Sequence, residues 1–241
     1  MIKTAINATL LTLSLGLSSA SLASGRAVGV EITNLTNSTY FTPLLIAAHD
    51  RVLRLFQVGT PASEALQAMA EGGELTGLIQ EVAAAGGNYV ENPAGGLLAP
   101  GASATATLKV ASHTRHLSVT AMLLPTNDGF VGLDGVAIPR RPGVYTYYLR
   151  GYDAGTEAND ELITGGGAVG VSGIPADPGG NAGADGTGVA GPDQNPNVHI
   201  HRGTVGDLDS EGGPSDLDAG VHHWLNPVAK LTVTVGGRIR Y

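Results

Sequence analysis

The chain has 241 residues, with 21 acidic and 13 basic side chains, a formal net charge of −8 and no cysteine. The acidic balance argues against nucleic-acid binding, for which a basic patch is expected, and the lack of cysteine excludes disulfide bonds. A chain of this length still buries about 70% of its unfolded surface, which is enough to stabilise a large domain without cross-links.

The N-terminus has the three-part layout of a secretory signal peptide. Lys3 precedes an apolar run over residues 6–17, and small residues up to Ala23 provide a cleavage site. The run is short for a membrane span, which needs about 20 apolar residues. We therefore expect a signal peptide over residues 1–23 and a single mature domain over residues 24–241, secreted or periplasmic and without a transmembrane segment.

Short segments in which apolar and polar residues alternate dominate the rest of the chain, as expected for half-buried strands. Turns rich in Gly, Pro and Asn separate them, which is typical of an antiparallel sandwich or barrel. The clearest predicted strands cover residues 28–34, 102–110, 117–124, 144–149 and 229–235.

Two helices are predicted in one region rich in Ala and Glu. The Thr60-Pro61 pair can cap and open the first helix, over residues 62–71, and the second covers residues 74–85. We expect both to cover one end or face of the sheet. The predicted fold class is therefore all-β with minor helix.

Glycine dominates residues 165–196, where large apolar side chains are few. This composition predicts a long loop with few buried contacts, because its apolar surface is too small for a separate folding unit. A further acidic stretch follows this loop and is interpreted as flexible and solvated. Its acidic residues are Asp207, Asp209, Glu211, Asp216 and Asp218.

Two other acidic segments, residues 127–135 and 152–161, each follow a predicted strand and can form neighbouring loops at one end of a sandwich. Ca²⁺ takes about six to eight oxygen ligands, and glycines in both segments let backbone carbonyls approach. Neither segment has the ligand spacing of an EF-hand. Spacing alone leaves open whether these acids are calcium ligands or turn formers. The acidic residues of the two segments are Asp128, Asp134, Asp153, Glu157, Asp160 and Glu161.

The same segments resemble the spondin N-terminal domain family. The resemblance rests on Asn-Asp-Gly-Phe-Val-Gly at residues 127–132, Tyr-Asp-Ala-Gly-Thr-Glu at 152–157 and Asn-Pro-Val-Ala-Lys-Leu-Thr-Val at 226–233, with support from residues 41–50 and 66–73. It implies an antiparallel β-sandwich similar to calcium-dependent lipid-binding domains, with one Ca²⁺ held between loops at one end.

The resemblance also implies a set of calcium ligands. The family uses an Asp in the first loop and two Asp residues that flank the Ala-Gly-Thr turn, and these positions correspond here to Asp128, Asp153 and Glu157. Glu157 departs from the family's Asp, keeping the charge and adding a methylene. Asp134 and Asp160 are second-tier candidates.

The animal members of the family are extracellular-matrix and adhesion proteins. The resemblance therefore implies a secreted calcium-binding module for adhesion or ligand binding at the cell envelope or outside the cell. Its partner would be an extracellular protein, a glycan or another surface ligand, and its particular identity does not follow from the family.

A histidine cluster supports a second hypothesis. His199 and His201 would point to one face of a strand, and His222 or His223 could supply a third ligand for zinc or copper. Hydrogen bonding within loops is the competing interpretation of these imidazoles. Since no cysteine nucleophile, Gly-x-Ser-x-Gly elbow or phosphate loop is present, the first hypothesis is a binding module that is not an enzyme. The alternative is a histidine-liganded transition-metal enzyme or metal-binding protein.

Overall fold

The computed structural model describes residues 25–189 and 195–236. Strands dominate these residues and two short helices interrupt them, which confirms the prediction of an all-β fold with minor helix. The elements are β1 (Arg26–Asn34), β2 (Tyr40–Phe41), β3 (Leu45–His49), α1 (Glu64–Gly72), α2 (Thr76–Ala84), β4 (Asn88–Glu91), β5 (Ser103–Val110), β6 (His116–Leu124), β7 (Gly129–Ala137), β8 (Gly143–Asp153), β9 (His199–Ile200) and β10 (Ala229–Val235).

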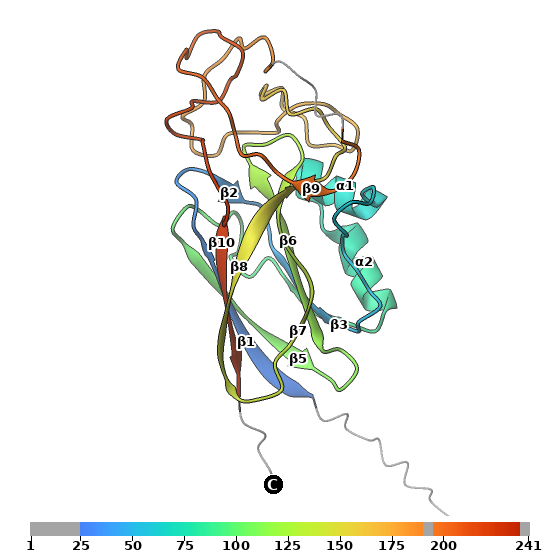
Figure 1. The fold of residues 1–241 in the computed structure, drawn as a ribbon. Coiled ribbons are helices and arrows are strands. Elements are labelled where there is room, and N and C mark those ends of the chain that lie inside the picture. Colours follow the sequence, from blue (N-terminus) through green and yellow to red (C-terminus); the bar gives the residue numbers. More distant parts are fainter. Residues whose placement is uncertain (1–24, 190–194, 237–241) are drawn as a thin grey trace, which may run out of the picture.

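The strands form one antiparallel sheet that folds over on itself, in the order β4-β3-β6-β7-β8-β10-β1-β5. The terminal strands β4 and β5 contact each other, so the sheet is nearly closed and resembles a barrel flattened into two layers (Figure 1). The long strand β8 belongs to both layers. Its residues 143–149 pair with β10, and its last residues, Arg150–Asp153, pair with β7.

Strand β6 explains how the sheet carries two apolar cores. Its odd-numbered residues from Leu117 to Leu123 join the core between the two layers, which also contains Ile32 and Leu231. Its even-numbered Met122 points to the other face, where a second core lies under the helices. β6 is therefore buried on both faces, and every residue from Leu117 to Leu124 is buried, including the polar Ser118 and Thr120.

The two helices cover the outer face of the sheet over β3 and β6, as the sequence predicts (Figure 1). Leu66 and Leu78 anchor them in the second core. The predicted helix start is wrong, because the N-cap is Ser63, whose side chain accepts a hydrogen bond from the N–H of Leu66, and not Thr60. Gly73 ends α1 in the left-handed conformation that favours glycine.

The described residues between β8 and β10, 154–189 and 195–228, form a cap over one end of the sandwich (Figure 1). Buried carboxylates order this cap. Glu161 accepts hydrogen bonds from the N–H groups of Val205 and Gly206, both at 2.7 Å, and from the hydroxyl of Ser215 at 2.7 Å. Asp216 accepts two more backbone N–H bonds, from Ile163 and Gly186.

These bonds correct the expectation of few buried contacts around the Gly-rich loop, and the interpretation of all the later acids as solvated. Asp216 is only 6% exposed and links segments far apart in the chain. Asp209 and Glu211 are exposed, as expected. The cap is more ordered than its composition predicts because carboxylates can replace apolar contacts in a glycine-rich segment. Each carboxylate accepts several backbone N–H bonds.

Candidate cation site

Asp128 and Asp153 lie at the capped end of the sandwich, where β7 begins and β8 ends. Gly129 pairs with Asp153 in the antiparallel ladder, and the N–H of Ala154 donates to the carbonyl oxygen of Asp128 at 3.3 Å. Both aspartates are buried, with exposures of 0% and 1%. The strand register therefore places two carboxylates next to each other inside the protein.

One oxygen of Asp128 is heavily hydrogen-bonded and the other is not. Oδ2 accepts bonds from the backbone N–H groups of Thr156 and Glu157, at 2.8 and 3.1 Å, and from the hydroxyl of Thr156 at 3.2 Å. Oδ1 is buried without a hydrogen-bond partner among the described residues. A buried carboxylate oxygen without a donor is costly, so Oδ1 is available to a cation.

The Asp-Ala-Gly-Thr turn after β8 positions the donors. Asp153 Oδ1 accepts the N–H of Gly155 at 2.8 Å, and Asp153 Oδ2 accepts from Asn159 Nδ2 at 2.6 Å. Gly155 has a φ of +72°, and a side chain there would lie 2.7 Å from the carbonyl oxygen of Asn195. Only glycine therefore fits the turn that brings Thr156 back to Asp128.

Burial and neighbouring negative charges raise the pKa of two of these carboxylates. Burial, followed by the nearby charge of Asp153, raises the pKa of Asp128 to about 7. Burial also raises the pKa of Glu157 to about 7, with further contributions from the charges of Glu71 and Asp128. Glu157 Oε2 accepts the N–H of Gly173 at 3.1 Å, whereas Oε1 is buried without a partner among the described residues.

Glu71 is a member of this acidic group that the sequence did not reveal. It is fully buried near the end of α1, where its carboxylate accepts from Gln67 Nε2 and from the N–H of Gly170, both at 2.7 Å. The spacing of Gln67 and Glu71 by one helical turn was the available signal. Nothing in that spacing indicates that the helix ends beside Glu157.

The two second-tier acids lie in different places. Asp160 is at the capped end, where its Oδ1 accepts from Asn127 Nδ2 at 2.8 Å. The sequence suggested that Asp134 lies in a loop with Asp128. This is wrong, because Gly129–Ala137 form strand β7. Asp134 lies six positions after Asp128 along the extended chain, which corresponds to about 20 Å, and Asp134 is paired with Arg54 Nη1 at 2.8 Å.

The four histidines take part in the hydrogen bonding of the cap. His201 and His222 are buried, and their Nδ1 atoms accept the N–H groups of Gly203 and Asp218, at 2.9 and 3.0 Å. A ring nitrogen of His223 lies 2.7 Å from the carbonyl oxygen of Thr204. His199 Nδ1 lies 2.9 Å from the carbonyl oxygen of Asn197 and 3.7 Å from Asp153 Oδ1.

Within residues 25–189 and 195–236, no three or more His, Asp or Glu side chains are placed together as a complete set of metal ligands. The histidines therefore do not converge on a common point in this part of the chain. The acidic group is a buried carboxylate pair with a third carboxylate beside it. A cation there would need further oxygens from the backbone and from water.

The fold and this site define an all-β module that carries a buried carboxylate pair between loops at one end. The Spondin_N family model matches residues 33–161, more than half of the chain, and the chain therefore belongs to the spondin N-terminal domain family. The matched region includes both helices and Asp128, Asp153 and Glu157, and it ends within the cap. No curated protein matched the sequence.

Family membership confirms the resemblance that the two acidic segments indicated. Spondin_N is not a known enzyme family. No helix in the described part of the chain has the length and apolar character needed to span a bilayer. The predicted signal peptide, residues 1–23, lies outside the described residues.

Proposed function

We propose that this chain is a secreted or periplasmic calcium-binding module for adhesion or ligand binding, with no catalytic role. The observation that carries the proposal is the buried pair of Asp128 and Asp153, together with the unpartnered oxygen of Asp128. Two adjacent buried carboxylates repel each other when both are ionised. A bound divalent cation would remove that repulsion and stabilise the loops around it.

The residues present fit calcium better than a transition metal. The candidate ligands are carboxylates of Asp128, Asp153 and Glu157, and hard cations such as Ca²⁺ prefer oxygen ligands. Asp128 Oδ1 and Glu157 Oε1 are both buried and lack hydrogen-bond donors among the described residues. Both side chains have raised pKa values, so the metal-free site binds protons that a cation would displace.

The binding role rests on family membership and on the ordered cap. Family members in animals act in adhesion outside the cell, and loops on a rigid scaffold are common positions for binding surfaces. An extracellular protein, a glycan or another surface ligand is the partner that this role requires. The proposed location follows from the signal-like N-terminus.

Metal analysis of the mature protein, purified without chelator, tests the proposal. We expect calcium at about one ion per chain, removable by a chelator. Calcium in neither the purified nor the calcium-dialysed protein would contradict it. Stoichiometric zinc, copper or iron would support the alternative of a histidine-liganded metal protein.

A further inference from the structure

Strands β7 and β8 separate from each other and leave a fork in the sheet (Figure 1). They pair only through Gly129–Gly132 and Arg150–Asp153. Earlier in β8, residues 143–149 pair with β10, and beyond Gly132 strand β7 continues alongside β6. Among the described residues, one edge of β8 is therefore without a neighbouring strand over residues 143–149.

The backbone direction of this edge follows from one hydrogen bond. The N–H of Val228 donates to the carbonyl oxygen of Leu149 at 2.9 Å, so Leu149 directs its main-chain polar groups toward β10. In an antiparallel strand the direction alternates from residue to residue. Val144, Thr146 and Tyr148 therefore direct their N–H and C=O groups into the fork, where another strand can pair with them.

The side chains of this edge favour a strand and do not protect it. The segment is Gly-Val-Tyr-Thr-Tyr-Tyr-Leu, which is rich in β-branched and aromatic residues. Val144 is 68% exposed and Tyr148 is 64% exposed. Exposed edges are usually blocked by lysine, proline or a bulge. None of these occurs within residues 143–149.

Positive charge surrounds the edge although the chain as a whole is acidic. Arg140 and Arg141 lie in the turn before β8, and Arg150 lies where β8 begins to pair with β7. All three arginines are exposed. No Asp or Glu occurs between Gly135 and Tyr152 or in β10, which adds Lys230 next to Tyr148. None of the three arginine side chains has an ion pair within the described residues.

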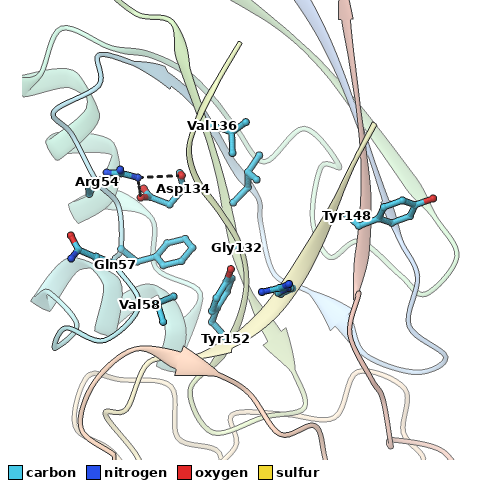
Figure 2. Close-up of a pocket in the computed structure, with 11 residues that line it drawn as sticks. Arg54, Gln57, Val58, Gly132, Asp134, Val136, Tyr148 and Tyr152 are labelled. Atoms are coloured by element: carbon cyan, nitrogen blue, oxygen red, sulfur yellow. Dashed lines mark hydrogen bonds and ion pairs between the residues drawn. The ribbon is translucent and has the colours of Figure 1, made fainter. Parts of the chain in front are cut away.

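A pocket of about 440 Å³ lies where β7 and β8 come together at the closed end of the fork (Figure 2). Tyr148 and Arg150 of β8 line it, together with Gly132 of β7 and with Arg54, whose charge Asp134 already neutralises at 2.8 Å. Its volume is enough for one or two side chains of a bound peptide. Arg150 is the guanidinium in this pocket that lacks a carboxylate partner among the described residues.

We infer that the free edge of β8 binds an acidic, extended segment of a partner protein by strand addition, with a carboxylate of that segment at Arg150. The main-chain groups of Val144, Thr146 and Tyr148 supply the pairing, and the arginines at both ends select acidic side chains. A second copy of this chain is a poor occupant, because pairing two β8 edges brings like-charged arginines together. The inference rests on the proposed function in taking the chain as a binding module.

Fluorescence anisotropy of a labelled peptide, Glu-Val-Thr-Val-Thr-Val-Glu, with the mature chain tests this inference. We expect saturable binding that weakens as salt is added. The same peptide with Lys in place of Glu should bind at least about tenfold more weakly. A version N-methylated at alternate backbone nitrogens, which cannot form the ladder, should show a similar loss.

Variants of the chain separate the backbone and charge contributions. Thr146→Pro removes an N–H that faces the fork and should weaken binding by about tenfold or more, whereas Thr146→Ala keeps this N–H and should bind like wild type. Arg150→Gln should weaken binding by about tenfold and reduce the salt dependence. If circular dichroism shows that Thr146→Pro is unfolded, the N-methylated peptide tests the same hydrogen bonds.

Equal binding of the N-methylated and unmodified peptides, or of the Glu and Lys peptides, would overturn the inference. So would a sulfated polysaccharide that displaces the peptide and binds Thr146→Pro and wild type equally, because the arginines would then recognise polyanions without strand pairing. Repeating the titration with calcium and with chelator distinguishes the two proposals. Peptide binding in both conditions, without any calcium-dependent stabilisation, would contradict the calcium site alone.

Discussion

Asp128 and Asp153 are neighbours because Asp128 directly precedes β7 and Asp153 ends β8, and Gly129 pairs with Asp153 in the ladder between these strands. Both side chains are buried, so neither can turn into solvent to avoid the other's charge. The geometry of the candidate cation site is therefore fixed by strand register.

Calcium should stabilise the wild-type protein and should stabilise Asp153→Asn much less. Binding only to the folded state raises the free energy of unfolding by about 2.7 kcal/mol at a hundredfold excess over the dissociation constant. Asp153→Asn preserves the shape of the side chain and removes one charge from the pair. Thermal melts with calcium and with chelator measure the difference.

The matched control for this substitution is Asp209→Asn. Asp209 is exposed in the cap, where its carboxylate accepts one N–H, from Glu211. The Asp209→Asn variant should keep the full calcium-dependent increase in melting temperature. An equal shift in wild type and Asp153→Asn would remove Asp153 from the site.

In chelator, the wild-type protein should become more stable between pH 8 and pH 5 relative to Asp128→Asn. The pKa of Asp128 rises from 3.8 to about 7 in the folded state. The folded protein therefore binds a proton in this window that the unfolded chain does not bind, and its stability increases as pH falls. Comparison with the variant cancels opposing groups such as His49, whose pKa burial lowers. Urea denaturation at several pH values measures the free energy of unfolding of both proteins. If this free energy changed with pH by the same amount in the wild type and in Asp128→Asn, the prediction would be contradicted.

Glu161→Gln should loosen the cap. The carboxylate accepts three hydrogen bonds, from Val205, Gly206 and Ser215, and an amide group would face some of these donors with its own N–H₂. A loss of about 1–3 kcal/mol is expected, with faster proteolysis within the cap. Glu211→Gln, at an exposed position, is the control. Equal protease resistance of both variants would show that Glu161 does not order the cap.

Leu66→Ala should destabilise the fold by about 2–5 kcal/mol, because it leaves a cavity in the core between α1 and the sheet. Leu66 is 1% exposed. Leu208→Ala removes the same atoms from a residue that is 85% exposed, and its effect should be within about 0.5 kcal/mol. Midpoints of urea denaturation give both values. Similar midpoints for the two variants would refute the role of α1 in the core.

Export should produce a mature chain that starts at Ser24 or within a few residues of it, because small residues precede the expected cleavage site. N-terminal sequencing of protein recovered outside the cytoplasm decides this. A soluble cytoplasmic protein that retains Met1 would contradict the proposed location and the extracellular role.

Alternation of apolar and polar residues predicted several strands, including β6, and left others such as β3 and β7 unpredicted. β1 and β10 alternate between buried and less buried residues, and both were predicted. All five residues of β3 are buried, so it shows no alternation. β7 was mistaken for a loop because its glycines and acids are typical of turns, although Gly132 is there to admit the ring of Phe56.

The candidate site was predictable only in part, for a similar reason. The residues around Asp128 and Asp153 form recognisable local motifs, and the family resemblance linked them. Glu71 and Glu161 act through contacts with segments distant in the chain. Glu71 lies one helical turn after Gln67 and Glu161 lies in an acidic segment, but neither pattern indicates which distant backbone groups they bind. The fork beside β8 depends on which strands pair, which neither the alternation nor the composition of β8 reveals.

The cap leaves and rejoins the sandwich at adjacent positions, because β8 and β10 are ladder neighbours and Leu149 pairs with Ala229. It is thus an elaborated hairpin connection between two adjacent antiparallel strands. The entropic cost of closing such a connection rises only slowly with its length. A relative could therefore carry a shorter or unrelated insertion here and keep the same sheet, so that this end of the molecule can diversify while the strand framework stays constant.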